Sequence, residues 1–181
     1  MKPPELFIIT GVSGSGKTTI ARALSERGEV ALDSKVTPGI YHFVDGDGNE
    51  APEIRWHDPE WRQTYKWSLN RVILESQMRA HANADRVFLC GRANLFQYMN
   101  IAERVFLLQV SPETLLRRLN DERRDNLFAK DAETQTKLTS QLEAVQRKIL
   151  DKGGVAIDAE RPVDQVVNEI LSKLKPDGKL G

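Results

Sequence analysis

The chain has few of the residues that stabilise small secreted proteins or attract polyanions. Its 181 residues include a single cysteine, Cys90, which excludes a disulfide framework and a cysteine-rich zinc site. Lysine plus arginine and aspartate plus glutamate each number 26, so the formal net charge is zero. A neutral chain has no general attraction for nucleic acid or acidic membranes, and neither is expected as a partner.

Long apolar runs are also missing. No stretch approaches the roughly 20 apolar residues that a helix needs to span a bilayer. The run Leu6–Thr10 is too short for a signal peptide and leads into a glycine-rich segment. A lone thiol fits a reducing compartment. The sequence therefore predicts a soluble cytoplasmic protein with one domain, residues 1–181, as a monomer or a homodimer.

Five short apolar runs are continuous rather than alternating, which is typical of strands buried on both faces of a sheet. They are Leu6–Thr10, Val30–Asp33, Arg86–Cys90, Arg104–Val110 and Val155–Asp158. Helical patterns lie at Lys17–Arg27, Pro59–Ala82, Pro112–Asn120 (with Ser111 as N-cap), Asp131–Leu150 and Pro162–Leu174. Strands that alternate with helices predict an α/β fold, with a parallel sheet and helices on both faces.

One motif has a specific chemical meaning. Residues 11–18, GVSGSGKT, match G-x-x-x-x-G-K-[ST] and stand between a predicted strand and a predicted helix. Glycines let backbone N–H groups line a concavity that binds phosphate oxygens, and the helix start adds unpaired N–H groups. The lysine supplies charge for the β- and γ-phosphates, and the Thr18 hydroxyl is a ligand for Mg²⁺. The predicted nucleotide-binding residues of this P-loop are Gly11, Ser13, Gly14, Ser15, Gly16, Lys17, Thr18 and Thr19.

The P-loop leaves the acceptor of the γ-phosphate open. In an open parallel sheet, ligands bind beyond the carboxyl ends of the strands. Asp33 ends the second predicted strand, so its carboxylate can orient an acceptor hydroxyl, take its proton or hold metal-bound water, or else it caps a turn. Arg92 follows the third strand, where it binds an anionic or hydroxyl-bearing substrate or is a surface arginine. Cys90 is interpreted as a core residue rather than a nucleophile.

All three tryptophans fall within residues 56–67, in the stretch RWHDPEWRQTYKW that begins at Arg55. On the expected helix, Trp61, Tyr65 and Leu69 share one face. We interpret Arg55, His57 and Trp61 as substrate contacts in an aromatic and basic wall over the acceptor. The alternatives are that the aromatic residues are core and that the histidine is an ordinary loop residue.

A second charged stretch, LLRRLNDERRDNLFAK, contains four arginines. Arginines on a lid stabilise the charge that phosphoryl transfer spreads over the transferring group, and a closed lid excludes water. The alternative is a solvated helix face with salt bridges. We therefore expect an acceptor-binding segment at about 34–82 and a lid at about 120–131. The residues expected to act in catalysis are Lys17, Asp33, Arg123 and Arg124, and Arg117 and Arg118 are expected to bind the nucleotide.

The stretches GVSGSGKTTIARAL, ALDS, RRLNDERRDNLF and AIDAERPVDQVVNEIL together resemble the small P-loop kinases of the adenylate-kinase-like group, which includes shikimate and gluconate kinases. The loop GVSGSGK is similar to that of gluconate kinases. This resemblance implies a five-stranded parallel sheet in the order 2-3-1-4-5, a lid, and ATP with Mg²⁺. It also implies that Asp33 is the acidic residue after the second strand, that Arg117 or Arg118 stacks on adenine, and that Arg123 or Arg124 is the lid arginine.

The chain also departs from these relatives. Lys35 stands where shikimate and gluconate kinases carry a second acidic residue, and the Asp-Gly-Phe-Pro-Arg motif of adenylate kinase and the glycine-rich substrate motif of shikimate kinase are missing. The sequence therefore predicts ATP-dependent phosphoryl transfer to a hydroxyl of another small molecule, such as a nucleoside or a sugar acid. The alternatives are a nucleic-acid 5′-hydroxyl kinase, with bases stacked on the tryptophan-rich segment, and a nucleotide-hydrolysing switch. Neutral charge argues against the first, and the missing Asn-Lys-x-Asp motif argues against a GTPase switch.

Overall fold

The computed structural model describes residues 2–55, 58–121 and 131–174. The five apolar runs form one sheet from β1 (Glu5–Gly11), β2 (Val30–Asp33), β5 (Arg86–Arg92), β6 (Arg104–Gln109) and β7 (Val155–Asp158). These strands lie in the order β2-β5-β1-β6-β7, and each pairs in parallel with its neighbours. Numbered among themselves along the chain, they have the order 2-3-1-4-5, so the predicted fold is confirmed.

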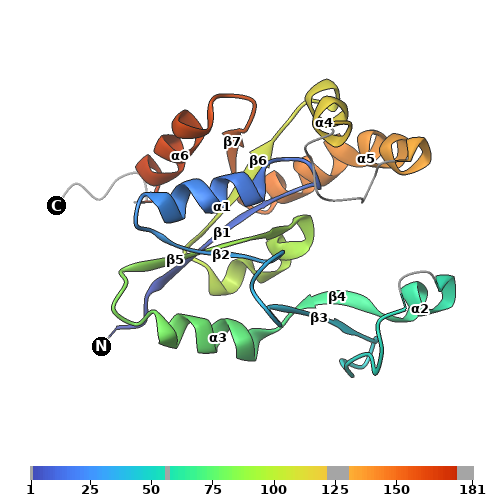
Figure 1. Cartoon of the computed structure of the whole chain (residues 1–181), viewed down its shortest axis with the longest axis horizontal. Helices are drawn as coiled ribbons and strands as arrows, with labels where there is room; N and C mark the ends of the chain where they lie inside the picture. The colour runs from blue at the N-terminus through green and yellow to red at the C-terminus, as the bar shows by residue number, and fades with distance from the viewer. Residues whose placement is uncertain (1, 56–57, 122–130, 175–181) are drawn as a thin grey trace.

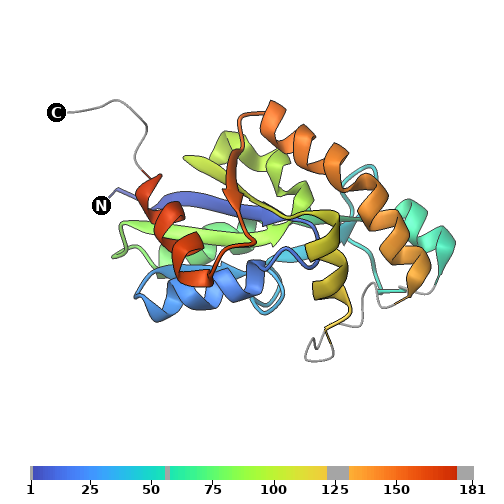
Figure 2. The ribbon, with the colours of Figure 1, turned by 90° about the horizontal axis from the view of Figure 1, so that it is seen from above.

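Helices cover both faces of this sheet (Figures 1 and 2). On one face lie α1 (Lys17–Glu26) and α6 (Val163–Ser172), and on the other lie α3 (Arg71–Ala80) and the 3₁₀ segment η1 (Ala93–Ile101). The remaining pair, α4 (Pro112–Leu119) and α5 (Ala132–Asp151), pack on each other beside β6. Within the residues that the structure describes, no helix combines the length and apolar character that a bilayer span requires.

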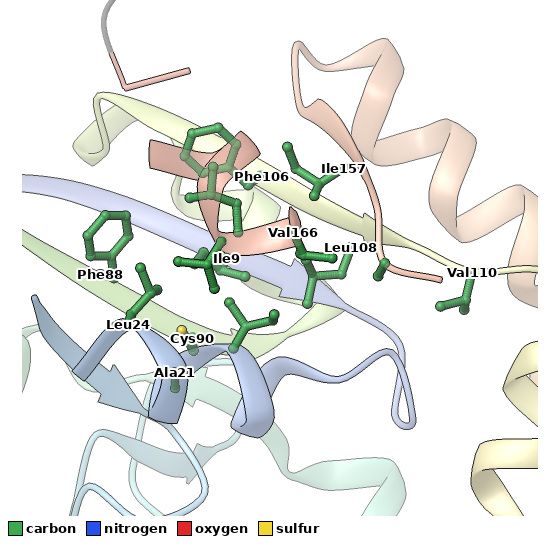
Figure 3. Close-up of a cluster of buried hydrophobic side chains, with 14 of the residues drawn as sticks. Ile9, Ala21, Leu24, Phe88, Cys90, Phe106, Leu108, Val110, Ile157 and Val166 are labelled. Atoms are coloured by element: carbon green, nitrogen blue, oxygen red, sulfur yellow. The ribbon is translucent and has the colours of Figure 1, made fainter. Parts of the chain in front are cut away.

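Alternation along each strand divides the core between the two faces. Phe7 and Ile9 of β1 face α1 and α6, whereas Leu6 and Ile8 face α3. Figure 3 shows the first face, where Ile9 lies between side chains of α1, α6 and the neighbouring strands. The Phe7 ring packs 5.6 Å from that of Phe88 on β5, between centroids. Burial of side chains of this size contributes about 1.5–3 kcal/mol each, so both faces hold the sheet in place.

Four of the helices in the described ranges, α2 (Pro59–Thr64), α3, α4 and α5, begin where a polar side chain caps them. Ser111 accepts a hydrogen bond from the backbone N–H of Thr114 at 3.2 Å, which confirms it as the N-cap of α4. Asp131 accepts a hydrogen bond from the backbone N–H of Thr134 at 2.7 Å at the start of α5. Hydrogen bonding to Thr134 lowers the pKa of Asp131. Four predicted helices, at Lys17–Arg27, Pro112–Asn120, Asp131–Leu150 and Pro162–Leu174, agree with α1, α4, α5 and α6 to within about two residues at each end.

The predicted helix over residues 59–82 is wrong. This segment forms α2 (Pro59–Thr64), β4 (Lys66–Leu69) and then α3, and β4 pairs in antiparallel fashion with β3 (Tyr41–Val44). Asn70 starts α3 as its cap by accepting from Ile73 N at 3.2 Å. Trp67 fits a pleated strand well, and pairing with β3 outweighs helix propensity here. Trp61 and Leu69 consequently do not share a helical face. We call β3, β4 and α2 the hairpin lobe, which projects away from the main sheet (Figure 1).

Candidate functional site

The P-loop, Gly11–Thr18, connects β1 to α1 as predicted. Gly14 and Gly16 have φ angles of 90° and 102°, in the left-handed region that other residues rarely adopt. A Cβ atom on Gly14 would also lie 2.9 Å from Cδ1 of Leu115 on α4. Glycine therefore lets the loop turn and pack closely against α4 at the same time.

The start of α1 is built to meet an anion. The Lys17 ammonium folds back over the loop, where Nζ donates to the carbonyls of Gly11 at 2.9 Å and Val12 at 2.6 Å. Gly16 precedes the helix and has no side chain to cap it, and the first turn of α1 contains no acidic residue. The first N–H groups of α1 and the positive end of its dipole thus fit a phosphate group. Thr18 lies partly buried in this first turn, and Thr19 beside it is exposed.

Asp33 lies at the carboxyl edge of the sheet, at the end of β2. It pairs in register with Cys90 of β5, and it is only 7% exposed. Oδ1 accepts a hydrogen bond from Lys35 N at 2.9 Å, so the turn-capping role that we considered is present. Oδ2 is buried, and no residue in the described ranges donates to it. A buried carboxylate oxygen without a partner in the protein is suited to accept a hydrogen bond from a ligand.

Cys90 lies on β5, in register with Asp33 of β2. It is completely buried in the core, as interpreted from the sequence. Burial raises the pKa of Cys90 far above its usual value; the negative charge of Asp33 raises it further, and the positive charge of Lys17 lowers it. Strand β5 separates β2, where Asp33 stands, from β1, which leads into the P-loop.

Arg92 ends β5 at the same edge. Its Cζ atom lies 4.1 Å from the centroid of the Trp67 ring, which is a cation–π contact. Desolvation by nearby protein atoms lowers the pKa of Arg92, although the side chain is exposed by surface area. No carboxylate in the described part of the chain forms an ion pair with it. A partly desolvated cation without a counter-charge in these ranges is suited to an anionic ligand.

Tyr41 is a site candidate that the sequence reasoning missed. Its hydroxyl lies beside Gly91, so close that a Cβ atom on Gly91 would be 2.5 Å from it and 3.2 Å from Ser34 Oγ. The hydroxyl is buried, has no hydrogen-bond partner among the described residues, and burial raises the pKa of Tyr41. No motif in the sequence marks Tyr41. Its position depends on the pairing of β3 with β4, and the sequence analysis predicted a helix where β4 lies.

The aromatic residues of the hairpin lobe pack mainly on one another. The Phe43 ring lies 4.8 Å from Trp61 and 4.4 Å from Trp67, between centroids. Trp61 is 7% exposed and belongs to the interior of this lobe. Arg55 is exposed and pairs with Glu53 at 3.0 Å. Substrate contacts by Arg55 and Trp61 stay predictions, and His57 lies outside the described residues.

The two arginines at the end of α4 have different surroundings. Arg118 donates from Nη1 to the Ser15 carbonyl at 3.1 Å and from Nη2 to the Ala159 carbonyl at 2.6 Å. Arg117 is exposed, with Nη2 3.5 Å from Thr114 Oγ1. Their roles in nucleotide binding stay predictions. Arg123, Arg124 and residues 122–130 of the predicted lid lie outside the described residues.

No group of three or more His, Cys, Asp or Glu side chains in the described ranges is arranged to hold a metal ion. A metal carried by a P-loop does not need such a cluster. It is held by one hydroxyl of the loop, phosphate oxygens and water. The position of Thr18 in the first turn of α1 fits this arrangement.

A comparison with protein families matches this geometry. The family model described as AAA domain matches residues 8–137, from β1 and the P-loop into α5. The chain belongs to this AAA domain family. A nucleotide-binding protein of Koribacter versatilis is 30% identical to it over 125 residues, which are 68% of this chain and 34% of that protein. The chain thus spans about a third of the length of that relative. A protein of Dictyostelium discoideum named probable gluconokinase is 28% identical over 182 residues, which are 94% of this chain and 86% of that protein.

Solved structures share the fold of this family member. A shikimate kinase from Bacteroides thetaiotaomicron superposes with a TM-score of 0.58, covers 94% of this chain and 98% of that chain, and is 16% identical. The resemblance to the small P-loop kinases is therefore confirmed as a resemblance of fold. The residues that contact an acceptor are not determined by this similarity.

Proposed function

We propose that this protein is an ATP-dependent kinase that transfers the γ-phosphoryl group to a hydroxyl of a small molecule. The observation that carries the proposal is the buried Oδ2 atom of Asp33, which has no partner in the described ranges and lies at the same sheet edge as the P-loop. A P-loop alone is equally compatible with ATP hydrolysis, whereas a carboxylate in this position can receive the proton of an acceptor hydroxyl. Relatives named as thymidylate kinase and probable gluconokinase support phosphoryl transfer to a small molecule.

The donor side is the P-loop and the start of α1. In this proposal the Lys17 ammonium moves from the carbonyls of Gly11 and Val12 to the β- and γ-phosphates, which offer it a full negative charge. Loop N–H groups, together with the Ser13 and Ser15 segment, hold the phosphate oxygens. Thr18 is the protein ligand for Mg²⁺, which neutralises phosphate charge when it is bound.

The acceptor side is formed by Asp33, Arg92 and Tyr41. The acceptor hydroxyl donates to Asp33 Oδ2, and its oxygen attacks the γ-phosphorus. The new P–O bond forms as the bond to the β-phosphate breaks; the proton passes to the carboxylate and ADP leaves. Arg92 orients an anionic or hydroxyl group of the acceptor, and the buried Tyr41 hydroxyl supplies one further hydrogen bond. A nucleoside or a sugar acid has the groups that this arrangement would bind.

The test is ATP turnover measured against a panel of nucleosides, sugars, sugar acids and other hydroxylated metabolites. Asp33→Asn should lower kcat more than tenfold and leave the affinity for ATP nearly unchanged, because the change removes only the proton acceptor. Lys17→Ala should abolish ATP binding while the circular dichroism spectrum stays that of the wild type. Asp47→Asn, which changes an exposed carboxylate in the β3–β4 connection, is the matched control and should have no effect. Removal of Mg²⁺ with a chelator should stop turnover reversibly.

Four outcomes would contradict the proposal. If the protein binds ATP but no acceptor accelerates ATP turnover, the protein is not a transferase. Fast ATP hydrolysis without any acceptor would favour the nucleotide-hydrolysing alternative. Equal turnover by the wild type and Asp33→Asn would remove the role of the carboxylate. Tight binding of single-stranded oligonucleotides at low salt would favour the nucleic-acid kinase, because phosphate contacts are strongest under those conditions.

A further inference from the structure

Helix α4 lies between the P-loop and the turn that follows β7. Its inner side packs on the P-loop, since a Cβ atom on Gly14 would lie 2.9 Å from Leu115 Cδ1 and 3.2 Å from Leu119 Cδ2. Its first residues contact the turn after β7, where the backbone N–H of Ser111 donates to Glu160 Oε1 at 2.6 Å. One short helix therefore touches both the loop that receives phosphates and the turn at residues 158–162.

Arg118 completes this connection from the end of α4. Its two Nη atoms bind two carbonyls that are far apart in the chain, Ser15 at 3.1 Å and Ala159 at 2.6 Å. Burial lowers the pKa of Arg118, and the neighbouring charge of Arg117 lowers it further. Because the guanidinium is planar and its two Nη atoms have a fixed separation, holding both carbonyls fixes them relative to each other more rigidly than an ammonium on a flexible stem would.

The orientation of the Ser15 carbonyl has a direct effect on the phosphate loop. In a trans peptide the C=O of one residue and the N–H of the next point in opposite directions. A Ser15 carbonyl held toward Arg118 therefore directs the N–H of Gly16 away from α4. Gly16 is the residue directly before α1, at a φ of 102°, so this N–H belongs to the donors at the helix start.

We infer that Arg118 is a positioning residue that sets the phosphate-binding conformation of the P-loop, and that it does not act by stacking on the nucleotide base. The inference rests on the donor side of the proposed function. The two adjacent arginines then have different roles. Arg117 is exposed and, within the described ranges, forms a hydrogen bond only with Thr114 of its own helix, so it does not hold the P-loop. If either of the two contacts a base, it is Arg117.

A ligand without a base separates the two roles. The affinities of Mg²⁺-ATP and Mg²⁺-tripolyphosphate are measured by calorimetry for the wild type, Arg118→Lys, Arg118→Gln and the control Arg117→Gln, with thermal melts to verify folding. Arg118→Gln should weaken both ligands by the same factor, about tenfold or more, because hydrogen bonds to a charged group are lost and the loop is no longer held. Arg118→Lys, which keeps the charge but lacks the planar fork that holds both carbonyls, should weaken the binding of both ligands by a smaller but equal factor. Arg117→Gln should leave the affinity for tripolyphosphate unchanged. Any loss of affinity that it causes should be confined to ATP.

Each other result overturns the inference. Weaker binding of ATP with unchanged binding of tripolyphosphate in either Arg118 variant would make Arg118 a base contact. Wild-type affinities for both ligands in the two folded Arg118 variants would reduce the bridge to a structural contact without influence on the loop. A wild-type protein that binds neither ligand would instead contradict the donor side of the proposed function, so the two failures are distinguishable.

Discussion

Replacement of Gly91 by alanine tests the packing at the end of β5 most directly. The new Cβ atom would lie 2.5 Å from the Tyr41 hydroxyl and 2.7 Å from Leu95 Cδ1. Both distances are below the 3.0 Å that real Cβ contacts reach. Leu95 is completely buried, and the Tyr41 hydroxyl is buried as well, so neither can move into solvent. The added methyl group must therefore push the buried Tyr41 and Leu95 side chains aside or shift the backbone that carries them.

The size of the effect follows from this crowding. Overpacking of a well-packed site costs about 1–3 kcal/mol, and two simultaneous contacts place Gly91→Ala near the upper limit, at about 3 kcal/mol. In a domain of this length, each kcal/mol lowers the melting temperature by roughly 2–4 °C. The variant should thus unfold about 6–12 °C below the wild type. Gly46→Ala is the matched control, because no atom of the described residues lies within 4 Å of the place that its Cβ would take, and it should change stability by less than about 0.5 kcal/mol.

A double-mutant cycle with Tyr41→Phe identifies the contact that is responsible. Tyr41→Phe alone should be neutral or slightly stabilising, because it removes a buried hydroxyl that lacks a partner in the described ranges. In the Gly91→Ala background it removes the nearer of the two contacts and should restore about 1–2 kcal/mol. The assay is urea and thermal unfolding followed by circular dichroism. A Gly91→Ala cost below about 1 kcal/mol, or strictly additive effects of the two changes, would refute this account of the site.

Three further predictions concern single residues. Ser111→Ala removes the side chain that accepts from Thr114 N, and it should cost about 1 kcal/mol, or roughly 2–4 °C in melting temperature; an unchanged midpoint would mean that the cap contributes nothing. Cys90 should resist an aromatic disulfide reagent at pH 8 in the native protein and react fully in urea, because burial raises its pKa and blocks access; rapid labelling of the native state would contradict this. The pKa of Glu160 is lowered from its ordinary value of 4.5, chiefly by hydrogen bonding to Ser111. The stability that the ionised Glu160 contributes is therefore fully present above about pH 4.5. It is lost as the pH falls through the pKa that Glu160 has in the folded protein, which is lower. Glu160→Gln should flatten this acid dependence of the unfolding free energy, and an unchanged slope would show that other carboxylates cause it.

The parts of the site that could be predicted are those whose chemistry is local in the sequence. The P-loop carries its glycines, lysine and threonine within residues 11–18, and the buried strands are continuous apolar runs. Asp33 could be placed because it ends such a run and because parallel strands share one carboxyl edge. These predictions needed no knowledge of distant contacts.

The parts that could not be predicted depend on pairing between distant segments. Whether Lys66–Leu69 forms a strand is decided by Tyr41–Val44, more than twenty residues earlier, and so the position of Tyr41 was hidden together with β4. The roles of Arg117 and Arg118 were equally undecided. Neighbouring residues on a helix point about 100° apart, and only the positions of Ser15 and Ala159 show which arginine faces inward.

The base of the hairpin lobe bears on how the acceptor specificity of the proposed kinase could change. The N–H of Asn70 donates to the carbonyl of Ile40 at 2.9 Å, so the chain leaves the domain and returns to it at nearly the same point. A segment whose two ends meet can be replaced by one of another length or sequence without moving the strands that flank it. The lobe is thus an exchangeable module: grafting residues 41–69 between relatives would alter what approaches Asp33, while the half of the molecule that contains the P-loop stays as it is.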